Sequence, residues 1–271
     1  MTAAPLTFGD VWTAARGHCT RGCFGYHSTW RLFRQAGLKG NPRWHEDFYR
    51  KALTGRRPKR ALVCGSSDET MPRLLTELLP DARIVVTDIC RTPLTLVNAW
   101  ADRCGRNVTT MWAKAPELAN VSGPFDMIIT DGLLSLLPTP DDRDTALARL
   151  ANLLTDDGML LYTTRIAGPA GRLEYDLPGR AVQALATAAG WPGPPGERLW
   201  LARQRLCGSS RPAPFTTSTQ LRDTFYTEFA QVLLSTHAAA PTLALALHPA
   251  FWAGRGSICV GVAATHPRSR L

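Results

Sequence analysis

The chain has 271 residues, of which 45% are hydrophobic, and its formal net charge at pH 7 is +9. This length and apolar content suffice for one large α/β core with an appendage. The N-terminal residues MTAAPLTFGD contain no basic region followed by an apolar core, and no apolar run is long enough to span a bilayer. We therefore expect a soluble cytoplasmic protein without a membrane partner, and the seven scattered cysteines are typical of reduced thiols.

The positive charge is concentrated near the N-terminus. Residues 1–59 carry 11 basic and 3 acidic side chains, whereas residues 60–271 carry 20 and 19. The excess indicates a segment that faces an anionic substrate or partner, or else a solvated basic surface. Of the 31 basic residues 27 are Arg, which the codon usage of a GC-rich genome would also produce. Basic and aromatic residues do not interleave as in RNA-recognition motifs, so nucleic acid is not the leading partner.

The first 55 residues predict three helices. Their expected limits are Thr7 to Gly17, an apolar patch that ends at Gly37, and Pro42 to Gly55. Three such helices cannot form a core alone. We therefore expect residues 1–59 to be a helical cap that packs on a main domain of residues 60–271.

From residue 60 onward, short apolar strands alternate with helices. Strands are expected at 61–64, 84–86, 108–112, 125–131, 159–164, 229–234 and 257–263, with late helices at 178–189, 198–207 and 217–223. A turn is expected at Asp157 and Gly158. Because the strands are continuously apolar, the pattern predicts an α/β fold with a doubly wound, mostly parallel seven-stranded sheet covered on both faces.

The stretch from Arg60 to Asp88 has the layout of a nucleotide-binding βαβ unit. Gly65 opens a tight turn after the first strand, and Asp88 ends the second strand, where a carboxylate can accept hydrogen bonds from ribose hydroxyls. Ser67 and Glu69 replace the later glycines of a dinucleotide fingerprint, and two acids in this turn would repel a pyrophosphate. S-adenosylmethionine (SAM), which has a ribose and cationic groups but no phosphate, suits this turn better.

Four strand-end motifs, LVCGSS, VVTD, FDMIITD and LTDDGMLLYTT, resemble those of class I SAM-dependent methyltransferases, in a small-molecule type with a helical N-terminal cap. The resemblance covers residues 60–165 well and the C-terminal third loosely. It implies SAM as cofactor, with Gly65, Ser66 and Ser67 along its methionine part, Asp88 at the ribose, Ile89 and Cys90 at the adenine, and Asp131 near the sulfonium. Val63 stands where the family has an acid, so Asp68 or Glu69 would replace that carboxylate against the SAM ammonium.

The acceptor side is less defined. Asp131, at the carboxyl end of a strand, is the first candidate for a catalytic base, with turn capping as the alternative. His27 and Tyr175 are further catalytic candidates, whereas His18 and His45 are weaker ones. The expected substrate contacts are Tyr26, Trp30 and Arg31, although aromatic residues at this spacing commonly pack in a core.

No metal site is expected. His18, Cys19, Cys23 and His27 would share one face of a continuous helix, but three glycines interrupt that helix. The cysteine spacing also differs from that of a zinc knuckle.

Three functions are compatible with these patterns. The first is methyl transfer from SAM to a small molecule, in bacterial specialised metabolism. The second is a cyclase or lyase that consumes SAM itself and releases methylthioadenosine, as in azetidine-2-carboxylate synthesis, since the glycine turn is altered. The third, ranked last, is an RNA-binding or RNA-modifying protein that uses the basic N-terminal segment. The acceptor and the oligomeric state are not defined by the sequence.

Overall fold

The computed structural model describes residues 6–35, 42–166, 177–207, 215–238 and 258–268. Its strands are β1 (Arg60–Cys64), β2 (Arg83–Asp88), β3 (Val108–Trp112), β4 (Phe125–Asp131), β5 (Leu154–Ile166), β6 (Phe229–Ala238) and β7 (Ile258–Pro267). Its helices are α1 (Phe8–His18), α2 (Phe24–Gln35), α3 (Pro42–Leu53), α4 (Thr70–Leu78), α5 (Arg91–Cys104), α6 (Leu133–Leu136), α7 (Pro140–Asn152), α8 (Leu177–Gly190), α9 (Pro195–Cys207) and α10 (Ser218–Tyr226). None of these described helices has the length and apolar character needed to cross a lipid bilayer.

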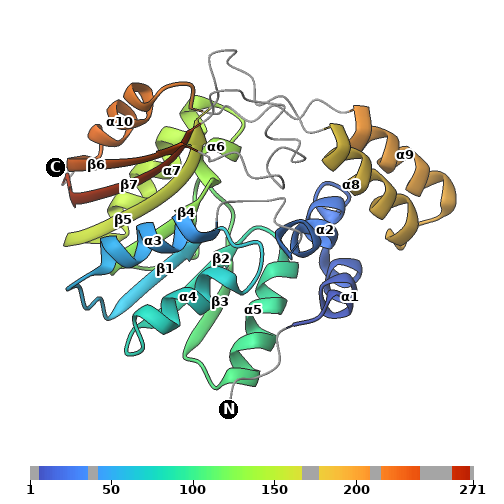
Figure 1. Ribbon diagram of the computed structural model, residues 1–271, viewed down its shortest axis with the longest axis horizontal. Helices are drawn as coiled ribbons and strands as arrows, with labels where there is room; N and C mark the ends of the chain where they lie inside the picture. Colours follow the sequence, from blue (N-terminus) through green and yellow to red (C-terminus); the bar gives the residue numbers. More distant parts are fainter. Residues whose placement is uncertain (1–5, 36–41, 167–176, 208–214, 239–257, 269–271) are drawn as a thin grey trace.

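The strands form one seven-stranded sheet in the order β3-β2-β1-β4-β5-β7-β6 (Figure 1). β1 to β5 pair in parallel, whereas β7 pairs antiparallel with both β5 and β6. The predicted doubly wound, mostly parallel seven-stranded sheet is therefore confirmed. The order reverses at β1, and ligands of open α/β sheets bind beside such a point, at the carboxyl ends of the strands.

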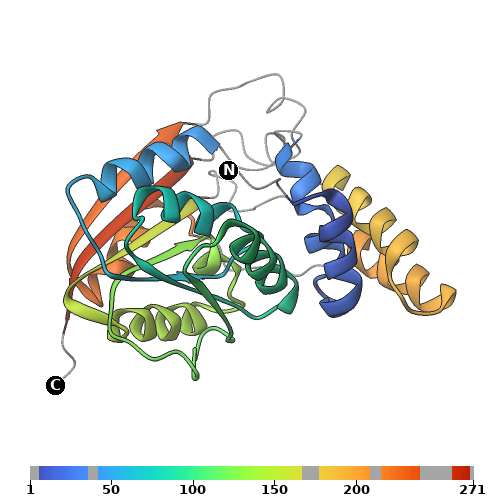
Figure 2. The same cartoon turned by 90° about the horizontal axis from the view of Figure 1, so that it is seen from below.

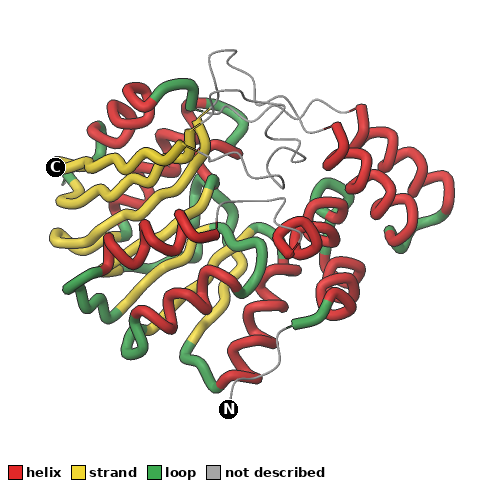
Figure 3. The backbone as a smooth tube through the Cα atoms, in the orientation of Figure 1, coloured by secondary structure: helices red, strands yellow, loops and turns green. Residues whose placement is uncertain are grey.

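Helices cover both faces of the sheet (Figure 3). On one face, α3, α4 and α5 pack against strand residues that include Val63 and Ile129. On the other face, α7 and α10 pack against a set that includes Leu62 and Ile128. Neighbouring residues of β1 and β4 thus point to opposite faces and are buried on both, which explains why these two central strands are largely apolar.

The first two helices lie away from the sheet, beside α8 and α9 (Figures 1 and 2). α1 buries Val11 and Ala14 against Trp100 of α5. α2 crosses α8 at Gly25, where an added Cβ would lie 2.8 Å from the Thr187 hydroxyl. α3, the third helix of the predicted cap, lies on the sheet instead, and the cap boundary at residue 59 stays a prediction.

The structure corrects two local expectations. Asp157 and Gly158, which were predicted as a turn, lie within β5, where the pairing with β4 shifts register between Phe125 and Met127. α6 was not predicted, because four residues without a side-chain cap leave no periodic signal.

Candidate active site

The turn after β1 is bonded to the end of β2. Gly65 has φ +78°, a conformation that favours glycine, and its N–H donates to the Thr87 carbonyl at 2.8 Å. The next N–H, of Ser66, donates to Oδ2 of Asp88 at 3.0 Å. We call this region, Gly65–Glu69 with Asp88, the β1–β2 edge.

Asp88 is the polar centre of the β1–β2 edge. Its Oδ1 atom also accepts from the N–H of Cys90 at 2.7 Å. Burial raises the pKa of Asp88 to about 6, although the hydrogen bonds from the Cys90 and Ser66 N–H groups oppose this shift. Each carboxylate oxygen has two lone pairs, so Asp88 can accept a further hydrogen bond from a ligand hydroxyl.

Apolar surface lies next to Asp88. Ile89 is 58% exposed, and Trp112 at the end of β3 is 47% exposed. The Trp112 indole N–H donates to the Ile89 carbonyl at 2.8 Å, which holds the ring beside it. An exposed aromatic ring and an exposed aliphatic side chain can contact the faces of a planar heterocycle.

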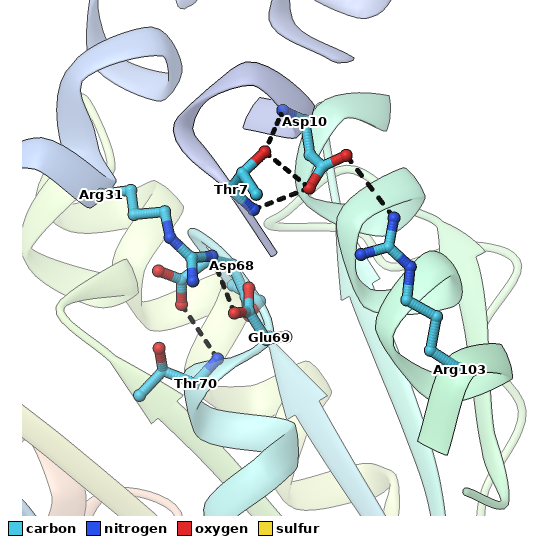
Figure 4. A network of polar contacts seen from close by, with 8 residues as sticks. Thr7, Asp10, Arg31, Asp68, Glu69, Thr70 and Arg103 are labelled. Atoms are coloured by element: carbon cyan, nitrogen blue, oxygen red, sulfur yellow. Dashed lines mark hydrogen bonds and ion pairs between the residues drawn. The ribbon is translucent and has the colours of Figure 1, made fainter. Parts of the chain in front are cut away.

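α2 contacts the β1–β2 edge through two polar pairs. The Tyr26 hydroxyl is 2.8 Å from the Ser67 hydroxyl. Arg31 donates to Oε1 of Glu69 at 2.8 Å, and both side chains are buried (Figure 4). The predicted substrate contacts Tyr26 and Arg31 are therefore next to the turn, and Trp30 packs beside Tyr26 with a centroid separation of 5.1 Å.

Three carboxylates affect the Tyr26 hydroxyl electrostatically. Burial raises the pKa of Tyr26 well above its ordinary value, and the negative charges of Asp131, Asp88 and Asp68 act in the same direction. Asp68 itself accepts a hydrogen bond from the N–H of Thr70 at the start of α4 (Figure 4). The region is therefore rich in negative charge, which favours a cationic ligand.

A second polar group lies where β4 ends, beside Thr163 of β5. Thr163 donates to Oδ1 of Asp131 at 2.8 Å, and the Tyr49 hydroxyl lies 2.9 Å from the Thr163 oxygen. Since the Thr163 proton is donated to Asp131, Tyr49 is the donor in the second bond. Nε2 of His45 lies 3.9 Å from the same Asp131 oxygen. We call His45, Tyr49, Asp131 and Thr163 the β4–β5 edge.

The position of α3 allows these contacts. The Phe48 ring lies over Gly261 of β7, where an added Cβ would be 2.5 Å from ring carbons. This close approach brings α3 onto the sheet, and His45 and Tyr49, four residues apart, share one helical face. Sequence reasoning ranked His45 low and missed Tyr49 and Thr163, although the four-residue spacing in WHEDFY is a usable signal.

The other predicted catalytic residues have different surroundings. His27 is only 7% exposed in α2, and burial lowers its pKa to about 4, so the imidazole is neutral at pH 7. Tyr175 lies outside the described residues. The sequence-based roles of both residues stay predictions.

The chain resembles known proteins in its three-dimensional structure but not in its sequence. No protein-family model matches the chain, and no curated protein sequence matches it. N-methyltransferase NodS from Bradyrhizobium japonicum WM9, solved with S-adenosyl-L-homocysteine (SAH), is 14% identical, with a TM-score of 0.52 and coverage of 85% of this chain and 91% of NodS.

Two further structures give similar values. The N-terminal domain of EvdMO1, solved in the presence of SAH and D-fucose, is 16% identical, with a TM-score of 0.51 and 84% coverage of each chain. A candidate O-methyltransferase from Nostoc punctiforme PCC 73102 is 15% identical, with a TM-score of 0.55 and coverage of 94% of this chain and 68% of its own. At such identities the similarity establishes the fold, which is that of class I SAM-dependent methyltransferases.

Proposed function

We propose that this chain is a SAM-dependent methyltransferase that acts on a small-molecule acceptor. The observation that carries the proposal is the β1–β2 edge, where Asp88 and the Gly65 turn lie on adjacent strands of a class I methyltransferase fold. NodS and EvdMO1, two structures of this fold, were solved with SAH. Asp88 would accept hydrogen bonds from the ribose hydroxyls, with Ile89 and Trp112 beside the adenine.

The charges of the site fit the amino-acid tail of SAM. Oε2 of Glu69 and Nε of Arg31 are buried and have no hydrogen-bond partner among the described residues. Unpaired buried polar atoms are costly, and a ligand that pairs them would be favoured. In this proposal Glu69 accepts from the SAM ammonium and Arg31 donates to the SAM carboxylate. Glu69 then supplies the carboxylate that is absent at Val63.

The β4–β5 edge offers a proton acceptor. SAM supplies an electrophilic methyl group on its sulfonium, so the chain must position an acceptor and remove its proton. In our proposal His45 takes the proton, because a neutral imidazole is a better base near pH 7 than an ionised carboxylate. Asp131, fixed by the Thr163 hydroxyl, stabilises the resulting imidazolium. The Tyr49 hydroxyl in turn orients Thr163.

A cytoplasmic location and a role in bacterial specialised metabolism belong to the same proposal. The support for the location is the seven scattered cysteines, and the support for a bacterial origin is that Arg makes up 27 of the 31 basic residues, as in a GC-rich genome. An anionic acceptor is consistent with the excess positive charge of residues 1–59.

The test is cofactor binding followed by product identification. Calorimetry should detect binding of SAM and SAH, and failure to bind either would refute the proposal. Incubation with SAM and a panel of small nucleophiles should then yield SAH. Methylthioadenosine as the nucleoside product would instead identify SAM as the substrate of a cyclase or lyase.

A further inference from the structure

Three cysteine thiols meet beside the β1–β2 edge. Cys19 follows α1, Cys23 precedes α2, and Cys90 stands between Asp88 and α5. The Sγ atom of Cys90 is 3.9 Å from that of Cys19 and 3.6 Å from that of Cys23, and all three atoms lie within 4.8 Å of one another. Cys90 is buried, whereas Cys19 and Cys23 are half-buried. Two segments distant in sequence therefore bring three potential soft-metal ligands to one point.

The sulfur separations match those of a tetrahedral thiolate site. A Zn–S bond of about 2.3 Å places adjacent sulfurs of a tetrahedron roughly 3.8 Å apart. Both separations measured from Cys90 are close to this value. A disulfide requires a much shorter S–S distance, about 2.05 Å, so the three thiols are unbonded.

The surroundings of the thiols also suit a bound cation. The Thr92 hydroxyl is 3.1 Å from the Cys19 sulfur, and the Thr20 hydroxyl is 3.4 Å from the Cys23 sulfur. Such hydroxyls can donate to metal-bound thiolates and orient them. Metal-binding thiolates commonly have hydrogen-bond donors of this kind in the second layer of residues.

A fourth donor is close in the chain. His27 lies four residues after Cys23, and its backbone N–H donates to the Cys23 carbonyl at 3.0 Å. Its ring nitrogens lie outside the group of three sulfur atoms that are within 4.8 Å of one another, so the side chain would have to move closer to bind the same ion. The His27 side chain is buried, and its Nδ1 atom has no hydrogen-bond partner among the described residues. An unpaired buried imidazole nitrogen is unfavourable, and coordination to a metal would remove that cost.

We propose that Cys19, Cys23 and Cys90 bind one zinc ion, with His27 as the candidate for the fourth position. Each cysteine releases its thiol proton to solvent on binding, and four protein ligands make such a site structural rather than catalytic. The proposal departs from the sequence-based prediction of no metal, which considered one continuous helix and did not include Cys90. α1 in fact ends at His18, and α2 starts at Phe24.

The zinc ion would join the turn between α1 and α2 to the segment that follows Asp88. α2 carries Tyr26 and Arg31, which contact the β1–β2 edge. Loss of zinc should therefore loosen α2 and lower both the melting temperature and the affinity for SAM. Zinc binding itself does not depend on the proposed function.

The first experiment measures metal content. Protein purified without a polyhistidine tag, under reducing conditions, should contain about one zinc per chain by elemental analysis. Cys90→Ser and Cys23→Ser should each lower the zinc content roughly tenfold or more. Cys104→Ser is the matched control, because Cys104 is a half-buried cysteine at the far end of α5, the helix that Cys90 precedes, and lies outside the cluster. It should retain zinc.

A second measurement uses the wild-type chain and does not depend on the folding of variants. Protein stripped with a chelator and titrated with Co²⁺ should develop thiolate-to-cobalt charge-transfer bands and the visible bands of tetrahedral Co²⁺, saturating at one equivalent. Wild-type protein that contains no zinc and shows no such bands would overturn the proposal, as would a disulfide among the three cysteines. SAM binding, measured separately on the same samples, tests the proposed function.

Discussion

On the β1–β2 edge the side chain of Asp88 accepts hydrogen bonds from Ser66 and Cys90, 22 and 2 residues away in the sequence, and both donors are backbone N–H groups. On the β4–β5 edge, the Thr163 hydroxyl is hydrogen-bonded to Asp131 and to Tyr49, which lie 32 and 114 residues away in the sequence. Both partners are side chains. The first arrangement depends on one carboxylate and a glycine turn. The second depends on three elements meeting in the right register.

This difference assigns separate tasks to the two edges. Backbone donors fixed by a short turn make a rigid site, which suits recognition of a constant cofactor. Side-chain hydrogen bonds between distant elements can vary with the acceptor without altering the fold. Substitutions on the β1–β2 edge should therefore change SAM affinity, whereas those on the β4–β5 edge should change turnover at unchanged SAM affinity.

The largest effect should follow removal of the proposed base on the β4–β5 edge. His45→Gln should lower kcat by about 10²- to 10⁴-fold, the usual contribution of a general base. The dissociation constant of SAH, measured by calorimetry, should not change. His18→Gln is the control, because His18 is an exposed histidine at the end of α1. Full activity of His45→Gln with the best acceptor would exclude His45 as the base.

Next in size is the loss of the carboxylate that we propose binds the ribose. Asp88→Ala should weaken SAH binding about 100-fold, or ~2.7 kcal/mol, because hydrogen bonds to a charged group contribute about 1.5–3 kcal/mol each. Asp126→Ala is a matched control: Asp126 also accepts from two backbone N–H groups, those of Lys59 and Arg60, at the opposite end of the sheet. It should reduce the melting temperature but leave the SAH affinity unchanged. Equal loss of affinity in both variants would show a general folding defect.

The same contrast explains how much could be predicted from the sequence. β3 and β4 begin and end where expected, since residues typical of turns flank both. Gly65 and Asp88 could be identified because the βαβ unit fixes their separation along the chain. The strand start predicted after a turn at Asp157 and Gly158 was wrong, because β5 already begins at Leu154 and these two residues lie in the irregular stretch between the Leu154 and Met159 pairs with β4.

Contacts between distant elements could not be predicted. The approach of α3 to the sheet depends on Phe48 lying over Gly261, a contact that no local pattern encodes. Without knowledge of this contact, the sequence does not reveal that His45 lies near Asp131, and His45 cannot be distinguished from the other five histidines. The meeting of Cys90 with Cys19 has the same origin, since it depends on how α1 packs against α5.

A smaller effect is expected from the buried ion pair of the β1–β2 edge. Glu69→Gln keeps the shape of the side chain but removes the charge proposed to pair with the SAM ammonium. The SAH affinity should fall about tenfold, or ~1.4 kcal/mol. Glu197→Gln is the control, because Glu197 pairs with Arg21, which is mostly exposed. An unchanged SAH affinity in Glu69→Gln would place the amino-acid tail elsewhere.

The smallest effect should come from the outermost hydroxyl of the β4–β5 edge. Tyr49→Phe removes the donor to Thr163, so kcat should fall about fivefold, or ~1 kcal/mol. Because Tyr49 acts through Thr163 on Asp131, its effect should largely disappear in an Asp131→Asn background, which a double-mutant cycle measures. Tyr162→Phe is the control: Tyr162 is another buried tyrosine, bonded to Ser135 on the opposite face of β5, and its loss should cost stability without changing kcat. Additive effects of Tyr49→Phe and Asp131→Asn would mean that Tyr49 only supports packing, and the β4–β5 edge would then reduce to His45 and Asp131.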